Sequence, residues 1–360
     1  MLPILLVQLL SKALPSHPPP RRRRDAAGAG KAGRHKRINL ALQGGGAHGA
    51  FTWGVLDHLL EDGRLGIKGI SGTSAGAVNA VMLADGLARG GPEEARTRLA
   101  EFWRAVSFGG DLPAVQRAVM ERLFSVAPFE DSPMKTWLDA VGRFFSPYDF
   151  NPLNINPLEQ LIERFVDFDA VRGFRELQLF VSATNVRTGQ LRVFKRDEIN
   201  AETIMASACL PFLFHAVEID GVPYWDGGYV GNPVIFPFFH AKQSEDVLIV
   251  QINPIERARM PRSAREIMSR VNEITFNSSL QAELRALECL HRPLNVHRIV
   301  LDDLGDRFGA ASRLKNDYEF FDVLRTMGKR AARRFLDDHF DDIGARSTIE
   351  MGAEEQTEPA

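Results

Sequence analysis

A serine lies at the centre of the pentapeptide Gly72-Thr73-Ser74-Ala75-Gly76, between an apolar run and a segment whose apolar residues recur at helical spacing. Glycines two positions before and after such a serine let a strand and a helix approach closely, so that the hydroxyl is held on a strained turn at the end of the sheet. This arrangement is typical of a serine nucleophile in acyl transfer. By itself the pentapeptide would be an ordinary glycine-rich turn, so its interpretation depends on the motifs around it.

A second glycine-rich loop, Gly44 to Gly49, satisfies the pattern G-x-G-x-x-G between a strand and a helix. That pattern fits a dinucleotide-binding loop, which also needs an acid at the end of the next strand to hold the ribose. The chain has Ser71 to Ser74 at that place, which disfavours a nucleotide. The backbone N–H groups of such a loop also bind the negative charge that develops on oxygen in acyl transfer.

A serine nucleophile needs a base, and the chain offers histidines and one conspicuous aspartate. The histidines in the body of the chain are His48, His58, His215, His240, His291 and His297. None of them follows an acid in the late loop that a Ser-Asp-His order requires. Asp226, by contrast, precedes Gly227 and Gly228 after a hairpin signal at Gly221, and the two glycines allow its loop to approach another backbone closely. Alone, Asp-Gly-Gly would be a simple turn.

The elements that must position these residues alternate between strand and helix. The first five are a strand at 38–43, the glycine loop, a helix that Gly63 ends, a strand at 67–70 and a helix at 77–87. This order predicts a parallel sheet with crossover helices. Further strands are expected at 177–184, 191–194, 247–253 and 296–301, and further helices at 93–106, 157–167, 261–289 and 315–339.

Together the motifs resemble the patatin-like phospholipase family. They occur in the family's order over roughly residues 38–235, and residues 206–214 resemble the family's small-residue helix, which ends in proline before the acid. The resemblance implies an α/β fold, a three-layer α/β/α patatin-like arrangement with a mainly parallel central sheet and helical additions.

The resemblance also implies roles for single residues. Ser74 would be the nucleophile, Asp226 the general base, and the amides of Gly44, Gly45 and Gly46 the oxyanion hole, with no cofactor and no metal. The glycines that flank the motifs are Gly49, Gly72, Gly76, Gly227 and Gly228. The third motif reads Asp-Gly-Gly where many members have Asp-Gly-Ala, and because both residues are small we expect little effect.

The chain is expected to divide into four segments. These are a disordered basic N-terminal extension (1–37), the patatin-like catalytic core (38–235), a C-terminal α/β extension packed on the core (236–347) and an acidic tail (348–360). Residues 107–156, rich in Phe and Pro, are either a lid over the site or a small helical insertion. In the C-terminal extension a polar helix face is expected to pack through hydrogen bonds, without catalytic work. Its members are Asn272, Glu273, Asn277 and Ser278.

Composition excludes several classes of protein. The chain has 360 residues, of which 44% are hydrophobic, and its net charge is −2, so it can bury a large core and is not disordered throughout. Two cysteines, Cys209 and Cys289, cannot form a disulfide scaffold or a four-cysteine zinc site. No stretch reaches the roughly 18 to 20 uninterrupted apolar residues of a membrane-spanning helix.

The charge is unevenly distributed. Residues 1–37 carry nine basic residues and one acid, a net charge of +8, so the remainder carries −10. The simplest interpretation of residues 1–37 is a solvated tail, a leader or a misplaced start. The alternative is that their apolar beginning and basic cluster bind an anionic membrane. We expect a cytoplasmic protein, with peripheral contact at the inner membrane surface left open, and no nucleic-acid partner, since the body is acidic.

The sequence therefore predicts a serine acyl hydrolase that cleaves fatty-acyl carboxylic esters of lipids through a Ser-Asp dyad and an acyl-enzyme. A thioesterase or an intracellular polyester depolymerase would use the same chemistry, and a nucleotide-binding regulatory protein is the alternative from another class. The partner is a lipid or other fatty-acyl ester substrate; the ester position, the acyl length and the oligomeric state are left undetermined.

Overall fold

The computed structural model describes residues 35–107, 146–151, 154, 156–211, 213–240, 244–257, 260–290, 294–301 and 317–349. The strands are β1 (Lys36–Leu42), β2 (Leu65–Gly72), β3 (Gln178–Asn185), β4 (Leu191–Lys195), β5 (Val217–Ile219), β6 (Val222–Asp226), β7 (Asp246–Gln251) and β8 (Asn295–Val300). The α-helices are α2 (Gly49–Asp62), α3 (Ala75–Gly90), α4 (Pro92–Val106), α7 (Pro147–Phe150), α8 (Pro157–Phe165), α9 (Phe168–Gly173), α10 (Ala201–Ser207), α11 (Ala264–Leu290) and α13 (Tyr318–His339). Short 3-10 turns are η1 (Gly46–His48), η2 (Arg196–Glu198), η3 (Gly227–Tyr229) and η4 (Phe236–His240).

All eight strands belong to one sheet, in the order β5-β6-β3-β2-β1-β7-β8, with β4 paired to β3. The pairs among β3, β2, β1, β7 and β8 are parallel, whereas β4, β5 and β6 pair antiparallel. The prediction of a mainly parallel α/β sheet is thus confirmed. Because β7 pairs with β1 and β8 pairs with β7, residues beyond 235 contribute two parallel strands to the same sheet.

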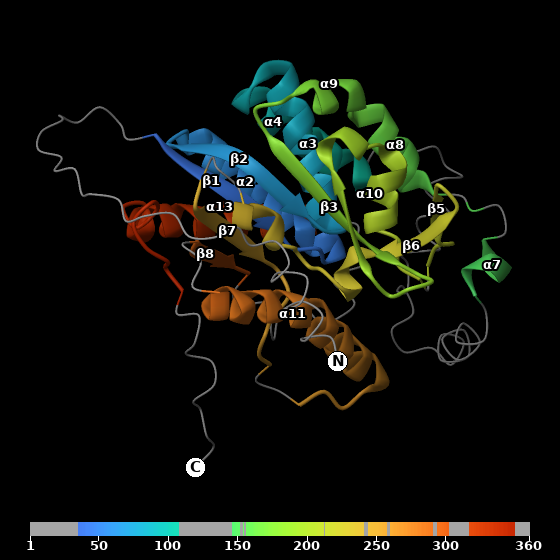
Figure 1. Cartoon of the computed structure of the whole chain (residues 1–360). Helices are drawn as coiled ribbons and strands as arrows, with labels where there is room; N and C mark the ends of the chain where they lie inside the picture. Colours follow the sequence, from blue (N-terminus) through green and yellow to red (C-terminus); the bar gives the residue numbers. More distant parts are fainter. Residues whose placement is uncertain are drawn as a thin grey trace, which may run out of the picture.

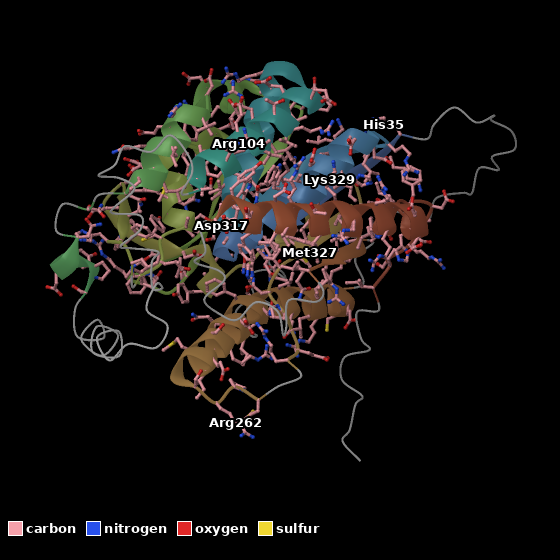
Figure 2. All side chains as sticks on the ribbon, turned by 180° about the vertical axis from the view of Figure 1, so that it is seen from behind. His35, Arg104, Arg262, Asp317, Met327 and Lys329 are labelled. Carbon is pink, nitrogen blue, oxygen red and sulfur yellow. The ribbon has the colours of Figure 1, made fainter. Side chains whose placement is uncertain are left out.

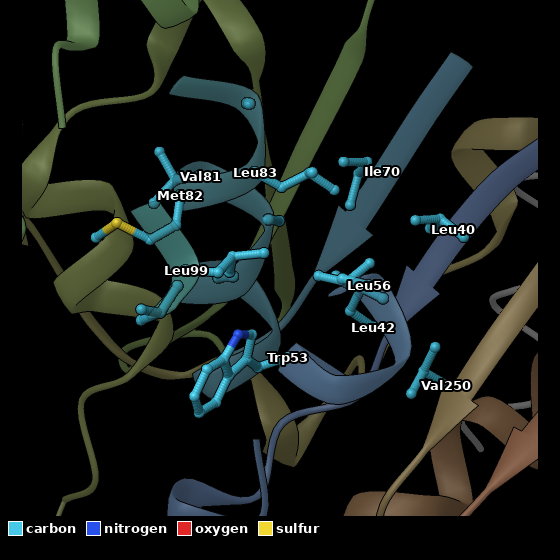
Figure 3. Close-up of a cluster of buried hydrophobic side chains, with 14 of the residues drawn as sticks. Leu40, Leu42, Trp53, Leu56, Ile70, Val81, Met82, Leu83, Leu99 and Val250 are labelled. Carbon is cyan, nitrogen blue, oxygen red and sulfur yellow. The ribbon is translucent and has the colours of Figure 1, made fainter. Parts of the chain in front are cut away.

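The sheet lies between two layers of helices (Figure 1). In a strand, successive side chains point to opposite faces. Leu40 and Leu42 of β1 therefore join the large core beneath α2, α3, α4 and α13, while Ala41 between them joins a smaller core on the other face. Figure 3 shows part of the large core, in which Leu56 of α2 lies near Leu42 of β1, whereas Trp53 of α2 lies on the side of α4, where it stacks on Trp103. The smaller core is closed by α11, which contributes Leu280 and Leu287.

Helix α13 packs along α2 (Figure 2), and ion pairs around the buried Asp57 join the two helices. Asp57 of α2 accepts hydrogen bonds from Arg96 of α4 and Arg325 of α13, and Lys329 lies 3.3 Å from its carboxylate. Burial raises the pKa of Asp57, but these cations outweigh it and hold the pKa below its usual value. A charged residue on a helix in the core is therefore stabilised by two helices that are distant in the sequence.

Several expectations can be compared with the described residues. The hairpin signal at Gly221 corresponds to the β5–β6 turn, where Gly221 has a φ of 72°. The first strand begins at Lys36, earlier than expected, and the Lys36 ammonium donates to the carbonyls of Phe340, Asp341 and Ile343. The expected lid or insertion lies largely outside the described residues, as do residues 1–34 and 350–360. Within the described ranges, no helix is long and apolar enough to cross a membrane.

Candidate active site

The turn between β2 and α3 holds Ser74 in a strained backbone conformation. Its φ of 54° and ψ of −123° are rare for a residue with a side chain and cost on the order of 1–3 kcal/mol. Glycine is needed on both sides of this turn because the surrounding backbone leaves no room for a side chain. A Cβ on Gly76 would lie 2.1 Å from the Leu42 carbonyl oxygen, and a Cβ on Gly72 would lie 2.6 Å from the Gly76 carbonyl oxygen. The expected strand-turn-helix context of Ser74 is therefore present.

Hydrogen bonds from two other segments hold this turn. The Ser74 amide donates to Ser207 Oγ at 2.9 Å, at the end of α10. Thr73 Oγ1 donates to the Gly231 carbonyl at 2.7 Å and also contacts Ser182 Oγ of β3. Ser207 belongs to the small-residue stretch that the sequence analysis singled out, and the structure gives it a definite partner in the serine turn.

Asp226 ends β6 and is wholly buried. Its amide donates to the Cys209 carbonyl at 2.8 Å, and its carbonyl accepts from Thr184 Oγ1 at 2.7 Å. On the side chain, Oδ1 accepts from the Gly228 amide at 2.7 Å. A Cβ on Gly227 would lie 2.3 Å from the Ser182 carbonyl oxygen, so a glycine is needed where the loop crosses β3.

The electrostatics of Asp226 suit a base that works near neutral pH. Burial raises its pKa from the ordinary 3.8 to about 7, while the Gly228 amide and the Ser74 hydroxyl act in the opposite direction with smaller effect. Among the described residues, Oδ2 has no partner with full hydrogen-bond geometry. The Ser74 hydroxyl thus faces the carboxylate without a completed hydrogen bond, as is common in catalytic sites without substrate.

The glycine loop lies directly against the serine. A Cβ on Gly44 would be 2.6 Å from Ser74 Cβ, so only glycine allows this approach. However, the Gly44 amide already donates to Asn232 Oδ1 at 2.6 Å, which departs from the expectation that it binds an oxyanion. In the described part of the chain, the amides of Gly45 and Gly46 have no acceptor, and they open the turn η1 that leads into α2. These two amides are the ones available for a developing negative charge.

A buried polar network fixes the glycine loop from behind. The Gly44 carbonyl accepts from Asn253 Nδ2 at 2.7 Å and from Asn232 Nδ2 at 3.3 Å. Gln43 Oε1 accepts from the amide of Asn253, and Gln43 Nε2 donates to Asn277 Oδ1 of α11, each at 2.8 Å. Sequence reasoning missed Asn232 and Asn253 as site residues. The available signal was that Asn253 closely follows a buried strand, at the sheet edge where Ser74 also lies.

Helix α11 reaches the loop of Asp226 directly. A Cβ on Gly228 would lie 2.7 Å from Cε2 of Phe276, whose ring also packs edge-on against Tyr229. The difference between glycine and alanine at 228 therefore depends on this helix and is larger than their volumes suggest. The expected packing role holds for Asn277 and for Glu273, which is buried and pairs with Arg257 and Arg270, but Ser278 is exposed.

Two of the six histidines named in the sequence analysis, His48 and His215, have surroundings that do not include Asp226. His48 is buried in η1, with its ring 6.3 Å from that of Phe320. His215 stacks on Tyr148 and contacts the Pro147 carbonyl through Nε2 at 3.1 Å. Within the described ranges, no histidine contributes to the pKa of Asp226, and no group of three or more His, Cys, Asp or Glu side chains could hold a metal ion.

A serine on a strained strand-helix turn at the carboxyl edge of a mainly parallel sheet is typical of α/β hydrolytic enzymes that use a serine. A family model described as "Patatin-like phospholipase" matches residues 40–239, more than half of the chain. The chain belongs to the patatin-like phospholipase family, and at the level of that family it is a lipid acyl hydrolase.

Solved structures with a similar arrangement include two bacterial proteins. VipD from Legionella pneumophila is 15% identical with a TM-score of 0.39, over 85% of this chain and 67% of that chain. ExoU in its complex with SpcU, from the type III secretion system of Pseudomonas aeruginosa, is 18% identical with a TM-score of 0.38, over 86% of this chain and 52% of that chain. The chain thus spans about half the length of ExoU. A comparison with curated proteins gave no match.

Proposed function

We propose that the protein hydrolyses fatty-acyl carboxylic esters of lipids with a dyad of Ser74 and Asp226. The observation that carries the proposal is the wholly buried Asp226, whose pKa of about 7 is affected by the hydroxyl of Ser74 on its strained turn. A carboxylate with that pKa is half ionised at neutral pH and is a far better base towards an alcohol than one with a pKa near 4.

In the proposed first step, Asp226 takes the hydroxyl proton while Ser74 Oγ attacks the ester carbonyl carbon. The carbonyl oxygen becomes negative and accepts hydrogen bonds from the amides of Gly45 and Gly46. In a comparable enzyme, removing one such donor costs about 3 to 4 kcal/mol of transition-state stabilisation. The C–O bond to the alcohol then breaks, the alcohol leaves with the proton from Asp226, and the acyl group remains on Ser74.

In the proposed second step, water repeats this chemistry on the acyl-enzyme. Asp226 takes a proton from the water, the hydroxide adds to the acyl carbon, and the proton passes to Ser74 Oγ as the fatty acid leaves. The network of Asn232, Asn253 and Gln43 supports the geometry, since it holds the Gly44 peptide against the serine turn. Preorganised donors of this kind need no rearrangement when charge develops.

A fluorophosphonate probe tests the nucleophile, because only an activated serine attacks phosphorus at a useful rate. We expect labelling of the wild-type protein at Ser74 and none in Ser74→Ala, with His48→Ala still labelled. Labelling of Ser74→Ala at another serine would refute the assignment. Hydrolysis of phospholipids, monoacyl lipids, triacylglycerols, acyl thioesters and short-chain esters, measured side by side, then separates a lipid esterase from the thioesterase and depolymerase alternatives.

A further inference from the structure

The first half of α11 exposes an apolar face to solvent. Ile267, Met268, Val271 and Ile274 have exposed fractions of 48%, 57%, 50% and 54%. Their spacing places them on one side of a helix, where residues three and four apart are neighbours. Met260, just before the helix, is 81% exposed. Contiguous exposed apolar side chains on a folded protein mark an interaction surface.

The apolar character is confined to this end of the helix. Further along the same exposed side come Ser278, Ala282 and Arg285, so large apolar residues stop at Ile274. The opposite side of α11 carries Leu280 and Leu287 into the smaller core, which accounts for the helix being held on the sheet. The exposed face is therefore not needed for packing within the described structure.

The sequence that carries the apolar face has a net positive charge. Residues 256–274 contain five arginines and three glutamates, a net charge of +2 in a chain whose total is −2. Arg262 is exposed just ahead of the helix (Figure 2). Arg257 and Arg270 pair with the buried Glu273, and Arg270 also donates to the carbonyls of Pro254 and Ile255. On the helix, Arg270 lies three residues after Ile267 and four before Ile274, so it is their neighbour at the edge of the apolar face.

This end of α11 lies at the same edge of the sheet as the candidate active site. The chain enters the helix from the carboxyl end of β7, which is parallel to β1 and β2. Two residues after Ile274, Phe276 contacts Gly228 in the loop of Asp226. An exposed apolar side chain and the catalytic loop are thus separated by about one half-turn of helix.

We propose that this apolar, arginine-flanked face of α11 docks the protein on the surface of an anionic lipid bilayer. The inference rests on the proposed lipid hydrolase function, because the acyl ester then comes from the surface that the helix contacts. An amphipathic helix with arginines beside its apolar face buries the apolar side chains at the headgroup boundary and attracts anionic lipids. A second copy of the chain is the alternative occupant of an exposed apolar face, and the experiments below distinguish it from a bilayer.

Vesicle sedimentation of the full chain tests the proposal, in a Ser74→Ala background so that the vesicles stay intact. The test variant is Met268→Gln, Val271→Thr and Ile274→Thr, which makes three exposed helix positions polar with little change in side-chain size. The matched control is Val323→Thr, an equally exposed aliphatic residue on α13, on the other side of the sheet. With vesicles of phosphatidylcholine and phosphatidylglycerol, we expect the test variant to bind at least about tenfold more weakly and the control to bind like the parent.

A second measurement reports the face itself, independently of contacts made elsewhere in the chain. A polarity-sensitive fluorophore on Val271→Cys, in Cys289→Ser, should shift to the blue when vesicles are added, whereas the same probe on Val323→Cys should not. No shift at 271, or equal binding by parent and test variant, would overturn the proposal. So would a parent that is dimeric in solution, does not bind vesicles and becomes monomeric in the test variant.

The experiments distinguish a failure of the docking proposal from a failure of the hydrolase proposal. Sedimentation and fluorescence need no turnover, so they hold or fail whether or not Ser74 is a nucleophile. With Ser74 restored, the test variant, the Val323→Thr control and the wild type should hydrolyse a soluble short-chain ester at the same rate. Vesicle binding without any ester hydrolysis would leave the docking face and remove the proposed reaction.

Discussion

The Asp226→Asn substitution removes the charge of the proposed base and keeps its shape. In the wild-type fold the carboxylate is wholly buried, and burial raises its pKa from 3.8 to about 7. An asparagine Oδ1 can still accept the hydrogen bond from the Gly228 amide. We therefore expect a variant that folds, has no buried charge at this position and is catalytically inactive.

The effect on stability depends on pH, and its sign follows from the direction of the pKa shift. Because the pKa of Asp226 is higher in the folded than in the unfolded state, this group contributes its full stability below about pH 4 and loses it as the pH rises to about 7. The loss is about 1.4 kcal/mol per pH unit and about 4 kcal/mol in total. Asp226→Asn has no such loss, so its stability relative to the wild type should increase with pH.

Equilibrium urea unfolding, followed by the fluorescence of the four tryptophans, measures this difference. Between about pH 5 and about pH 8, the free energy of unfolding of Asp226→Asn relative to the wild type should rise by about 2 to 3 kcal/mol. Glu283 is also buried, and burial raises its pKa to about 7, but both proteins carry it and its contribution cancels. A difference that stays constant with pH would refute the desolvated carboxylate.

The same protein samples test the catalytic role of Asp226. For the wild type, kcat/KM on a soluble ester should rise through an apparent pKa near 7, because the base must be ionised. In Asp226→Asn, kcat/KM should fall by at least about 100-fold, as for the loss of a general base. Wild-type activity without an acidic limb near pH 7 would contradict the assignment.

Three further predictions concern the loops around the serine and the need for metal. Gly228→Ala should destabilise the fold by about 1 to 3 kcal/mol in thermal or urea unfolding, because its Cβ would lie 2.7 Å from Phe276; adding Phe276→Leu should recover part of the loss, and purely additive effects would exclude this contact as the cause. Asn232→Ala leaves the Gly44 amide without its acceptor, so the free energy of unfolding should fall by about 1 to 3 kcal/mol. The substitution should also lower kcat more than it changes KM, and an unchanged kcat would show that this hydrogen bond does not support catalysis. Ester hydrolysis should continue with a chelator present, since the proposed mechanism uses a serine, a carboxylate and backbone amides; inactivation without unfolding would speak against it.

Local patterns were sufficient to predict much of the fold. Strand β1 and helix α2 were recognisable because apolar periodicity and punctuating glycines such as Gly63 reflect the chain's own geometry. Gly63 ends α2 with a φ of 71°. The turn of Ser74 was predictable for the same reason, since Gly72 and Gly76 are needed wherever a strand and a helix meet so closely.

Other features could not be predicted because they join segments that are far apart in the chain. The Gly44 amide is occupied by Asn232, 188 positions away, so the choice among three glycine amides needed the folded structure. Position 228 requires glycine because Phe276 lies too close for a Cβ, and this contact with a helix 48 positions later cannot be predicted from a local pattern.

The sequence by itself determined the kinds of groups available for chemistry: a serine on a forced turn, an aspartate in a glycine loop and a run of backbone amides. Each of these depends on residues within a few positions, where steric rules act directly. The tertiary structure alone decided that Asp226 is wholly buried beside Ser74, that its pKa is about 7, and that the apolar side chains from Ile267 to Ile274 on α11 are exposed. Desolvation and exposure depend on everything that packs around a group, and here the surrounding strands and helices come from the whole length of the described chain.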